Sequence, residues 1–330
     1  MTGAPDVDYT ATSLRPDWPA LPLALRESLT VALGSEVVGA GPSVSSGFTG
    51  GFAAPVRLAD GRRVFVKASD DTLHSYRAYQ REAKVVPQLP PEIRVPAILA
   101  TAHTTAAGQK WFAVVSEWVD GRMPGTPWSI ADFDAVTATC EAIAEVMEPS
   151  PLEGLRSFLV DLEESGSPLL TPARILDGEA PLPTGLQPWV PKVLPELVEL
   201  VQLAPEAFAG ETATHSDLRP DNLLIDGDGT CWTVDWNWLA LGPRWMDWVG
   251  LLPVAQHHGV DTAAAIRSSP LTADVPAEYL DCFIAAVAAY MMTRADEPPP
   301  FGCTPALREH QRFYAWTFLD WLAVRREWLR

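Results

Sequence analysis

A short stretch near residue 215 carries side chains that suit phosphoryl transfer from a nucleotide. Asp217 is followed five positions later by Asn222, and a second carboxylate, Asp235, ends the next run of β-strand type. In such transfer one carboxylate accepts the proton of an acceptor hydroxyl, while an amide and another carboxylate hold Mg²⁺ against the phosphates. The spacing therefore predicts Asp217 as base, and Asn222 and Asp235 as ligands of two Mg²⁺ ions. The alternative is a surface loop whose acidic side chains only cap turns or a helix.

The same stretch resembles a known family. His215-x-Asp217-(x)4-Asn222, followed by Asp235, is similar to the catalytic and metal-binding loops of the aminoglycoside phosphotransferases, which are small-molecule kinases with a protein-kinase-like fold. The middle of the loop also resembles the protein-kinase sequence D-L-K-P-E-N, with Arg219 where that loop carries Lys. The resemblance implies that Arg219 acts at the γ-phosphate and that His215 gives the loop structural support.

A second acidic residue beyond this loop is implied by the same resemblance. Asp247 lies in Trp245-Met246-Asp247-Trp248-Val249, among apolar residues. In the family an Asp at this place orients the catalytic loop and does not touch substrate. That supporting role is therefore expected for Asp247.

An expected β-strand upstream supplies a lysine for the phosphates. Residues 63–68 form an apolar strand in which Lys67 points inward, and an unpaired buried ammonium is costly. A helix predicted over residues 71–86 carries Glu82 on its apolar face, so Glu82 is the expected partner of Lys67. The pattern resembles the V-A-I-K strand, whose Lys holds the α- and β-phosphates and pairs with a helix Glu. The alternative places Lys67 at a sheet edge and Glu82 in solvent.

Two further segments resemble parts of a nucleotide site. Residues 45–51 are rich in glycine and small hydroxyls, which let backbone N–H groups approach phosphates closely, although a merely flexible hairpin is the alternative. The candidate contacts in this loop are Ser46, Gly47, Phe48 and Thr49. Residues 110–121 resemble the last small-lobe strand and hinge, which implies that Glu117 C=O and Val119 N–H face the purine. Ser116 behind the purine leaves both ATP and GTP open as donor.

These elements predict an α+β protein with a bilobal protein-kinase-like fold. Residues 1–119 form the expected N-lobe, with an N-terminal arm, a helix at 23–33 and a small antiparallel sheet that binds the nucleotide. Residues 120–330 form the expected larger, helical C-lobe with the catalytic loop. Within it, the Pro-rich stretch 149–195 is expected to build the acceptor pocket.

Composition excludes several other classes. The net charge of −18 argues against nucleic acid as a partner, because backbone phosphates require clustered Lys and Arg. No apolar run reaches the roughly 18–20 residues that span a bilayer, and the first residues lack the pattern of a secretory signal. We therefore expect a cytoplasmic protein with no membrane partner and with reduced cysteines. Monomer and homodimer both remain open.

The combined pattern predicts a small-molecule O-phosphotransferase that moves the γ-phosphate of a nucleoside triphosphate to a hydroxyl. The family resemblance favours an antibiotic acceptor, aminoglycoside-like or nucleoside-type, and hence resistance. A metabolite acceptor such as a sugar, an amino sugar, choline or homoserine is the alternative, and a non-catalytic nucleotide-binding regulator is an alternative of another class. Protein-kinase activity is disfavoured, because no A-P-E-like segment follows Asp235.

Overall fold

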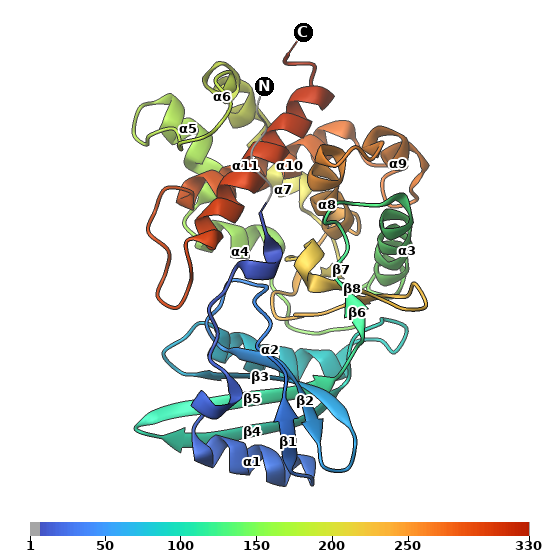
Figure 1. Cartoon of the computed structure of the whole chain (residues 1–330). Helices are drawn as coiled ribbons and strands as arrows, with labels where there is room; N and C mark the ends of the chain where they lie inside the picture. The colour runs from blue at the N-terminus through green and yellow to red at the C-terminus, as the bar shows by residue number, and fades with distance from the viewer. Residues whose placement is uncertain (1–6, 330) are drawn as a thin grey trace.

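A computed structural model of the chain describes residues 7–329. The start of the expected N-terminal arm, residues 1–6, lies outside the described residues. The chain folds into two lobes, one built on an antiparallel sheet and one made mainly of helices (Figure 1). The α+β, protein-kinase-like fold that the sequence predicts is therefore confirmed.

The sheet lobe contains five strands in the order β1-β2-β3-β5-β4, and each neighbouring pair is antiparallel. The strands are β1 Val37–Ala40, β2 Phe52–Leu58, β3 Arg63–Asp70, β4 Ile98–Ala106 and β5 Gln109–Glu117. Lys67 lies on β3, where it pairs with Ala53 on one side and Val114 on the other. Because β3 is the central strand, Lys67 is not at a sheet edge.

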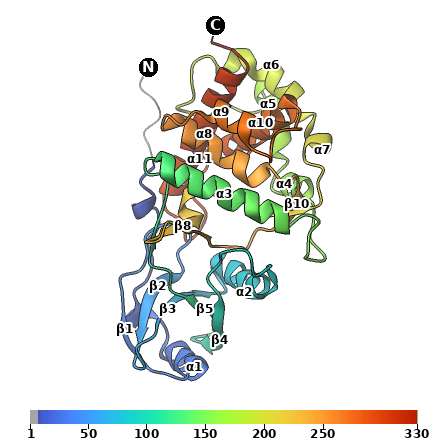
Figure 2. The same ribbon diagram turned by 90° about the vertical axis from the view of Figure 1, so that its right-hand side faces the viewer.

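One helix covers each face of the sheet. Helix α1, Leu23–Leu33, buries a stripe of three leucines against the strands and ends at Gly34, whose φ of 65° is left-handed, as the sequence pattern predicts. Helix α2, Ser75–Val85, packs on the other face (Figures 1 and 2). It begins four residues later than the expected helix over 71–86, because Asp70 Oδ1 accepts the Thr72 N–H in a turn at 2.9 Å.

The helical lobe follows the sheet lobe in the chain and has one large apolar core. Its helices are α3 Ile130–Val146, α4 Phe158–Glu164, α5 Thr171–Leu176, α6 Val190–Val201, α7 Ala204–Ala207, α8 Met246–His257, α9 Thr262–Ser268, α10 Ala277–Arg294 and α11 Ala306–Arg325. Its strands are β6 Gly121–Arg122, β7 Thr212–Thr214, β8 Leu223–Asp226, β9 Cys231–Thr233 and β10 Ala240–Gly242. The candidate catalytic loop connects β7 to β8, and Asp235 follows β9. These short strands hold the two acidic segments next to each other.

An apolar cluster joins the two lobes beside the site. Val85 at the end of α2 packs in one cluster with Met147 after α3 and with Trp236 and Leu239. Trp236 is fully buried, and its indole N–H donates to Thr233 Oγ1 at 2.9 Å. Since Trp236 follows Asp235 directly, this packing fixes the backbone from which the Asp235 carboxylate projects.

Two observations complete the fold. In the described part of the chain, the helices are all too short or too polar to cross a membrane. The four cysteines are free thiols, and Cys140, Cys231 and Cys282 are buried. Burial raises the pKa of Cys231 to about 11, so this thiol stays protonated near neutral pH.

Candidate active site

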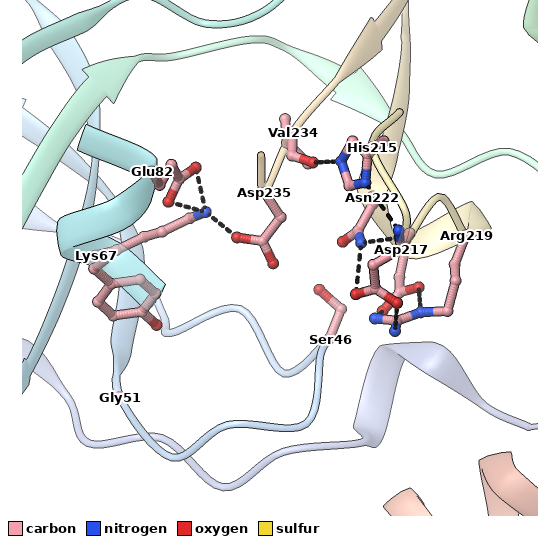
Figure 3. A network of polar contacts seen from close by, with 12 residues as sticks. Ser46, Gly51, Lys67, Glu82, His215, Asp217, Arg219, Asn222, Val234 and Asp235 are labelled. Carbon is pink, nitrogen blue, oxygen red and sulfur yellow. Dashed lines mark hydrogen bonds and ion pairs between the residues drawn. The ribbon is translucent and has the colours of Figure 1, made fainter. Parts of the chain in front are cut away.

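The Lys67 side chain joins two carboxylates that come from different lobes (Figure 3). Its Nζ donates to both oxygens of Glu82 on α2, at 2.8 and 2.9 Å, and to Asp235 Oδ1 at 2.6 Å. Glu82 is only 7% exposed, so the ammonium offsets a buried negative charge. The expected pairing of Lys67 with Glu82 is thus present, and Asp235 is a further partner of the same ammonium.

Burial and the neighbouring charges together set the pKa values of the three groups in this network. Burial alone would lower the pKa of Lys67, but the carboxylates of Asp235 and Glu82 raise it above its ordinary value. Burial would likewise raise the pKa of Asp235, yet the Lys67 ammonium outweighs burial and lowers it. For Glu82 burial dominates and raises the pKa. Asp235 therefore stays ionised near neutral pH and can bind a cation.

His215 ties the catalytic loop to the strand that ends before Asp235. Its Nε2 lies 2.9 Å from Val234 O, which can only accept, so Nε2 carries the proton. The unprotonated Nδ1 then accepts the Asp217 N–H at 3.4 Å. The imidazole thereby links the Asp217 backbone to the residue before Asp235.

The Asp247 carboxylate holds the beginning of the same loop. Its two oxygens accept the backbone N–H groups of His215 at 2.7 Å and Ser216 at 2.9 Å. Ser216 has a φ of 64° and Asp235 has a φ of 68°, which are left-handed values that a side chain disfavours. The strained backbone at Ser216 is therefore held by two hydrogen bonds that the half-buried Asp247 carboxylate accepts.

Arg219 forms an ion pair with the candidate base and with a neighbouring acid. Its Nη1 donates to Asp217 Oδ1 at 2.6 Å, and its Nε donates to Asp221 Oδ1 at 3.0 Å. The Asp221 side chain is only 1% exposed, and its ion pair with Arg219 holds the guanidinium in place. Asn222 Nδ2 donates to Asp217 O at 2.8 Å, which leaves the Asn222 amide oxygen available to a cation.

A cleft of about 380 Å³ opens between the lobes, within the size range of small-ligand pockets. Residues of the sequence prediction that line it are Ser46, Gly47, Thr49, Lys67, Glu82, Ser116, Glu117, Val119, Asn222 and Asp235. The Phe48 side chain lies elsewhere: its ring packs 4.8 Å from that of His310, and the Arg219 guanidinium lies 5.3 Å above it. Asp217 and Arg219 border a second, smaller cavity behind the loop.

The structure adds three residues to the site that sequence reasoning did not find. Tyr9 and Arg15 come from the N-terminal arm and line the cleft, and Asp221 fixes Arg219. An isolated Arg in a Pro-rich arm has no spacing that indicates a site. Asp221, however, lies inside the candidate catalytic loop, and its position next to Asn222 could have indicated that it belongs to the site.

Comparison with known proteins identifies the family. A family model described as the phosphotransferase enzyme family matches residues 46–267 of the 330-residue chain. The chain therefore belongs to this family. No curated protein gives a significant sequence match.

Solved structures share the fold. A thermostable mutant of aminoglycoside phosphotransferase APH(4)-Ia, in a ternary complex with ADP and hygromycin B, aligns with a TM-score of 0.60 and 12% identity over 91% of this chain and 98% of that one. APH(2")-IIia in complex with GDP and kanamycin aligns with a TM-score of 0.58 and 13% identity, over 93% and 99% of the two chains. An aminoglycoside phosphotransferase from Alicyclobacillus acidocaldarius gives 0.50 and 13%, over 94% and 97%. At these identities the likeness concerns the fold alone.

The contacts of Asp247 give a first prediction. In Asp247→Asn the amide nitrogen faces one of the two backbone N–H groups, which is left without an acceptor. A buried N–H without a partner costs about 1–3 kcal/mol, so we expect the free energy of unfolding to fall by that amount in urea titration. The turnover number should fall as well, since the loop that carries Asp217 loses its support. Asp274→Asn, at an exposed acid, is the control, and wild-type turnover in Asp247→Asn would contradict the supporting role.

Proposed function

We propose that this protein is a small-molecule O-phosphotransferase, which transfers the γ-phosphate of ATP or GTP to a hydroxyl of an antibiotic or a metabolite. The observation that carries the proposal is the position of the catalytic loop between two cavities. Asn222 and Asp235 border the cleft that suits a nucleotide, and Asp217 and Arg219 border the cavity behind the loop. A base with a phosphate site on one side and a second cavity on the other suits direct transfer.

In the proposed reaction Asp217 accepts the proton of the acceptor hydroxyl. The hydroxyl oxygen forms a bond to the γ-phosphorus, the bond from that phosphorus to the bridging oxygen breaks, and the nucleoside diphosphate leaves with the electron pair. Lys67 holds the α- and β-phosphates, and Arg219 offsets the charge of the transferred group. The hinge residues Glu117 and Val119 offer backbone groups to the purine.

The proposed Mg²⁺ ions fit the donor atoms that the site offers. The free amide oxygen of Asn222 and the ionised carboxylate of Asp235 border the same cleft. Mg²⁺ commonly takes one or two protein oxygens and completes its shell with phosphate oxygens and water. Bound there, the metal would neutralise charge on the phosphates. The lobes themselves are proposed to divide at 1–119 and 120–330, within the connection between β5 and β6.

Catalytic competence is proposed over a purely regulatory role. A nucleotide-binding regulator has no need of an acid at position 217, but this chain pairs Asp217 with Arg219 and supports its loop through His215 and Asp247. The same set of residues would serve an antibiotic or a metabolite acceptor, so the acceptor class depends on the shape and chemistry of the second cavity.

The role of Asp217 gives the test of the proposal. Asp217→Asn keeps the shape of the side chain but cannot accept the proton, so release of nucleoside diphosphate should fall about 10²–10⁴-fold. Binding of the triphosphate should change little, because Asp217 does not line the nucleotide cleft. The two quantities are measured by coupled diphosphate release, with ATP and GTP in parallel, and by equilibrium nucleotide titration. Asp228→Asn, in the exposed β8–β9 turn, is the matched control, and equal turnover in Asp217→Asn would refute the assignment of the base.

The surroundings of Asp217 also predict a pH dependence. Burial raises the pKa of Asp217 above its ordinary value of about 3.9, although the Arg219 guanidinium lowers it in part. Because the base acts only when deprotonated, kcat/KM for the acceptor should fall as the pH falls through this raised pKa. In Arg219→Gln the lowering charge is lost, so the acid limb should move to higher pH. A limb that stays in place in the pH profile of this variant would argue against Asp217 as the titrating group.

A further inference from the structure

A second cavity of about 80 Å³ borders the part of the catalytic loop that carries Asp217, and within residues 7–329 it shares no lining residue with the nucleotide cleft. It is enclosed by residues 216–219 together with parts of α4, α8, α10 and α11. Its volume is about half that of the roughly 150 Å³ apolar cavity that can hold a benzene molecule. The cavity can therefore take the end of an acceptor that carries the hydroxyl, with the remainder lying outside.

The walls of this cavity are mainly apolar. They are formed by Phe158, Met246, Phe283, Val287, Met291 and Phe318. The rings of Phe158 and Phe283 pack with their centroids 6.3 Å apart, and Phe283 also packs edge-on against Trp245. These six side chains favour contact with apolar surface and offer no hydrogen-bond acceptor to a buried ammonium.

Both carboxylates that line the cavity already accept hydrogen bonds from other residues. Among the described residues, the acids that line it are Asp217 and Asp247. Asp217 pairs with Arg219 through Oδ1, which leaves Oδ2 to the acceptor hydroxyl, and both oxygens of Asp247 accept backbone N–H groups. A polycationic acceptor would bring more ammonium groups here than the one free oxygen of Asp217 can pair, and a buried charge without a partner is strongly disfavoured.

We propose that the acceptor inserts a neutral, apolar end, on which the reacting hydroxyl sits, into this cavity. The inference rests on the proposed phosphotransferase function and narrows its acceptor class. Aliphatic or aromatic alcohols, or larger molecules that present such an end, fit the walls. Aminoglycosides, which carry several ammonium groups per molecule, do not.

Gly250 on α8 offers a substitution that fills the cavity while the fold is kept. A Cβ at this position would meet the Phe283 ring at 3.8 Å, which is ordinary van der Waals contact, and the backbone is helical. Replacing a helix glycine by alanine is favourable in itself. Gly250→Ala and Gly250→Val therefore narrow the acceptor cavity in two steps. Gly227→Ala, in the β8–β9 turn where a Cβ meets nothing within 4 Å, is the matched control.

The experiment measures diphosphate release by the wild type with two acceptor sets. One contains neutral aryl and alkyl alcohols and macrolactones, and the other contains aminoglycosides such as kanamycin and hygromycin B. We expect the highest kcat/KM within the neutral set. The KM for that acceptor should rise from Gly250→Ala to Gly250→Val, by about tenfold in the latter, while the KM for the nucleotide stays the same.

Two other outcomes are distinguishable. Highest kcat/KM with an aminoglycoside, unaffected by Gly250→Val, would overturn the inference about the acceptor but support the proposed phosphotransferase. Transfer to no member of either set, together with no binding of nucleoside triphosphate, would count against the proposed function itself.

An independent observation concerns the N-terminal arm, defined as residues 7–16. The arm descends along the helical lobe to the sheet and runs beside the glycine-rich loop, residues 45–51 (Figures 1 and 2). Thr12 Oγ1 donates to Gly47 O at 2.6 Å, and Thr304 Oγ1, just before α11, donates to Thr12 O at 2.5 Å. The arm thus connects the loop to the helical lobe. It lies outside the stretch that the family model matches.

Arg15 is the charged residue of this arm at the nucleotide cleft. Its Nη2 donates to Ser46 O at 2.9 Å, and its Nη1 donates to Gly51 O at 2.8 Å and to Tyr79 Oη on α2 at 3.2 Å. One guanidinium therefore holds both ends of the glycine-rich loop. It lines the same cleft as Lys67 and adds to the lowering of the Asp235 pKa, behind the larger influence of Lys67.

We infer that Arg15 is a positioning residue of the triphosphate site, which acts by clamping the glycine-rich loop over the phosphates. The planar guanidinium spans two carbonyls that a point-like ammonium cannot span in the same geometry. The inference rests on the proposed nucleotide site, but it does not depend on which acceptor is used.

The test is an equilibrium titration with AMP-PNP or GMP-PNP, whichever the wild type binds, and with the corresponding nucleoside. In Arg15→Ala we expect affinity for the triphosphate analogue to fall about tenfold or more, because charged hydrogen bonds that fix the loop are lost. Nucleoside affinity should stay the same. Arg15→Lys should not restore triphosphate binding, and Arg62→Ala, at an exposed arginine of the β2–β3 turn, is the control.

The outcomes separate the possibilities. Unchanged triphosphate affinity in Arg15→Ala would overturn the inference, and full rescue by Arg15→Lys would replace the clamp with a simple charge effect and so refute it. A wild type that binds neither analogue would count against the proposed function and not against the clamp.

Discussion

The Lys67 ammonium is the charge on which the rest of the active site depends. Glu82 on α2 and Asp235 after β9 lie close enough to repel each other, and the ammonium between them offsets both charges. The network closes only when β3, α2 and the helical lobe have one relative position. The apolar cluster around Trp236 supplies that position, because it packs the residue next to Asp235 against both lobes. Hydrophobic burial and an ion network thus support the same geometry.

The sequence was most informative where chemistry ties residue type to spacing. Asp217, Asn222 and Asp235 could be selected because base and metal-binding functions restrict both the side chain and its place in the loop. Helix α1 was predicted to the residue, because a leucine stripe and a terminal glycine each have a direct physical meaning. Local patterns of this kind involve residues a few positions apart, so they can be read without knowledge of the tertiary fold.

Other features depend on contacts between residues far apart in the sequence. The approach of Arg15 to Ser46 and Gly51, and the packing of Phe48 on His310, join segments that no periodic pattern relates. The apolar character of α10 indicates burial, but the direction in which Phe283 faces follows only from how α8 and α10 pack. The later start of α2 has a local cause instead, the hydrogen bond from the Thr72 N–H to Asp70 Oδ1 in a turn, which apolar periodicity does not indicate.

Part of the wall of the proposed acceptor cavity lies outside the stretch of chain that carries the proposed phosphate-binding and catalytic residues. Lys67, Asp217, Asn222 and Asp235 all lie within the matched residues 46–267, whereas the parts of α10 and α11 that face the cavity lie after them. Under the proposed function, a change in the α10 and α11 residues that face the cavity would alter acceptor recognition without replacing the residues that line the nucleotide cleft. Acceptor specificity could then change while the residues proposed to carry out phosphoryl transfer stay the same.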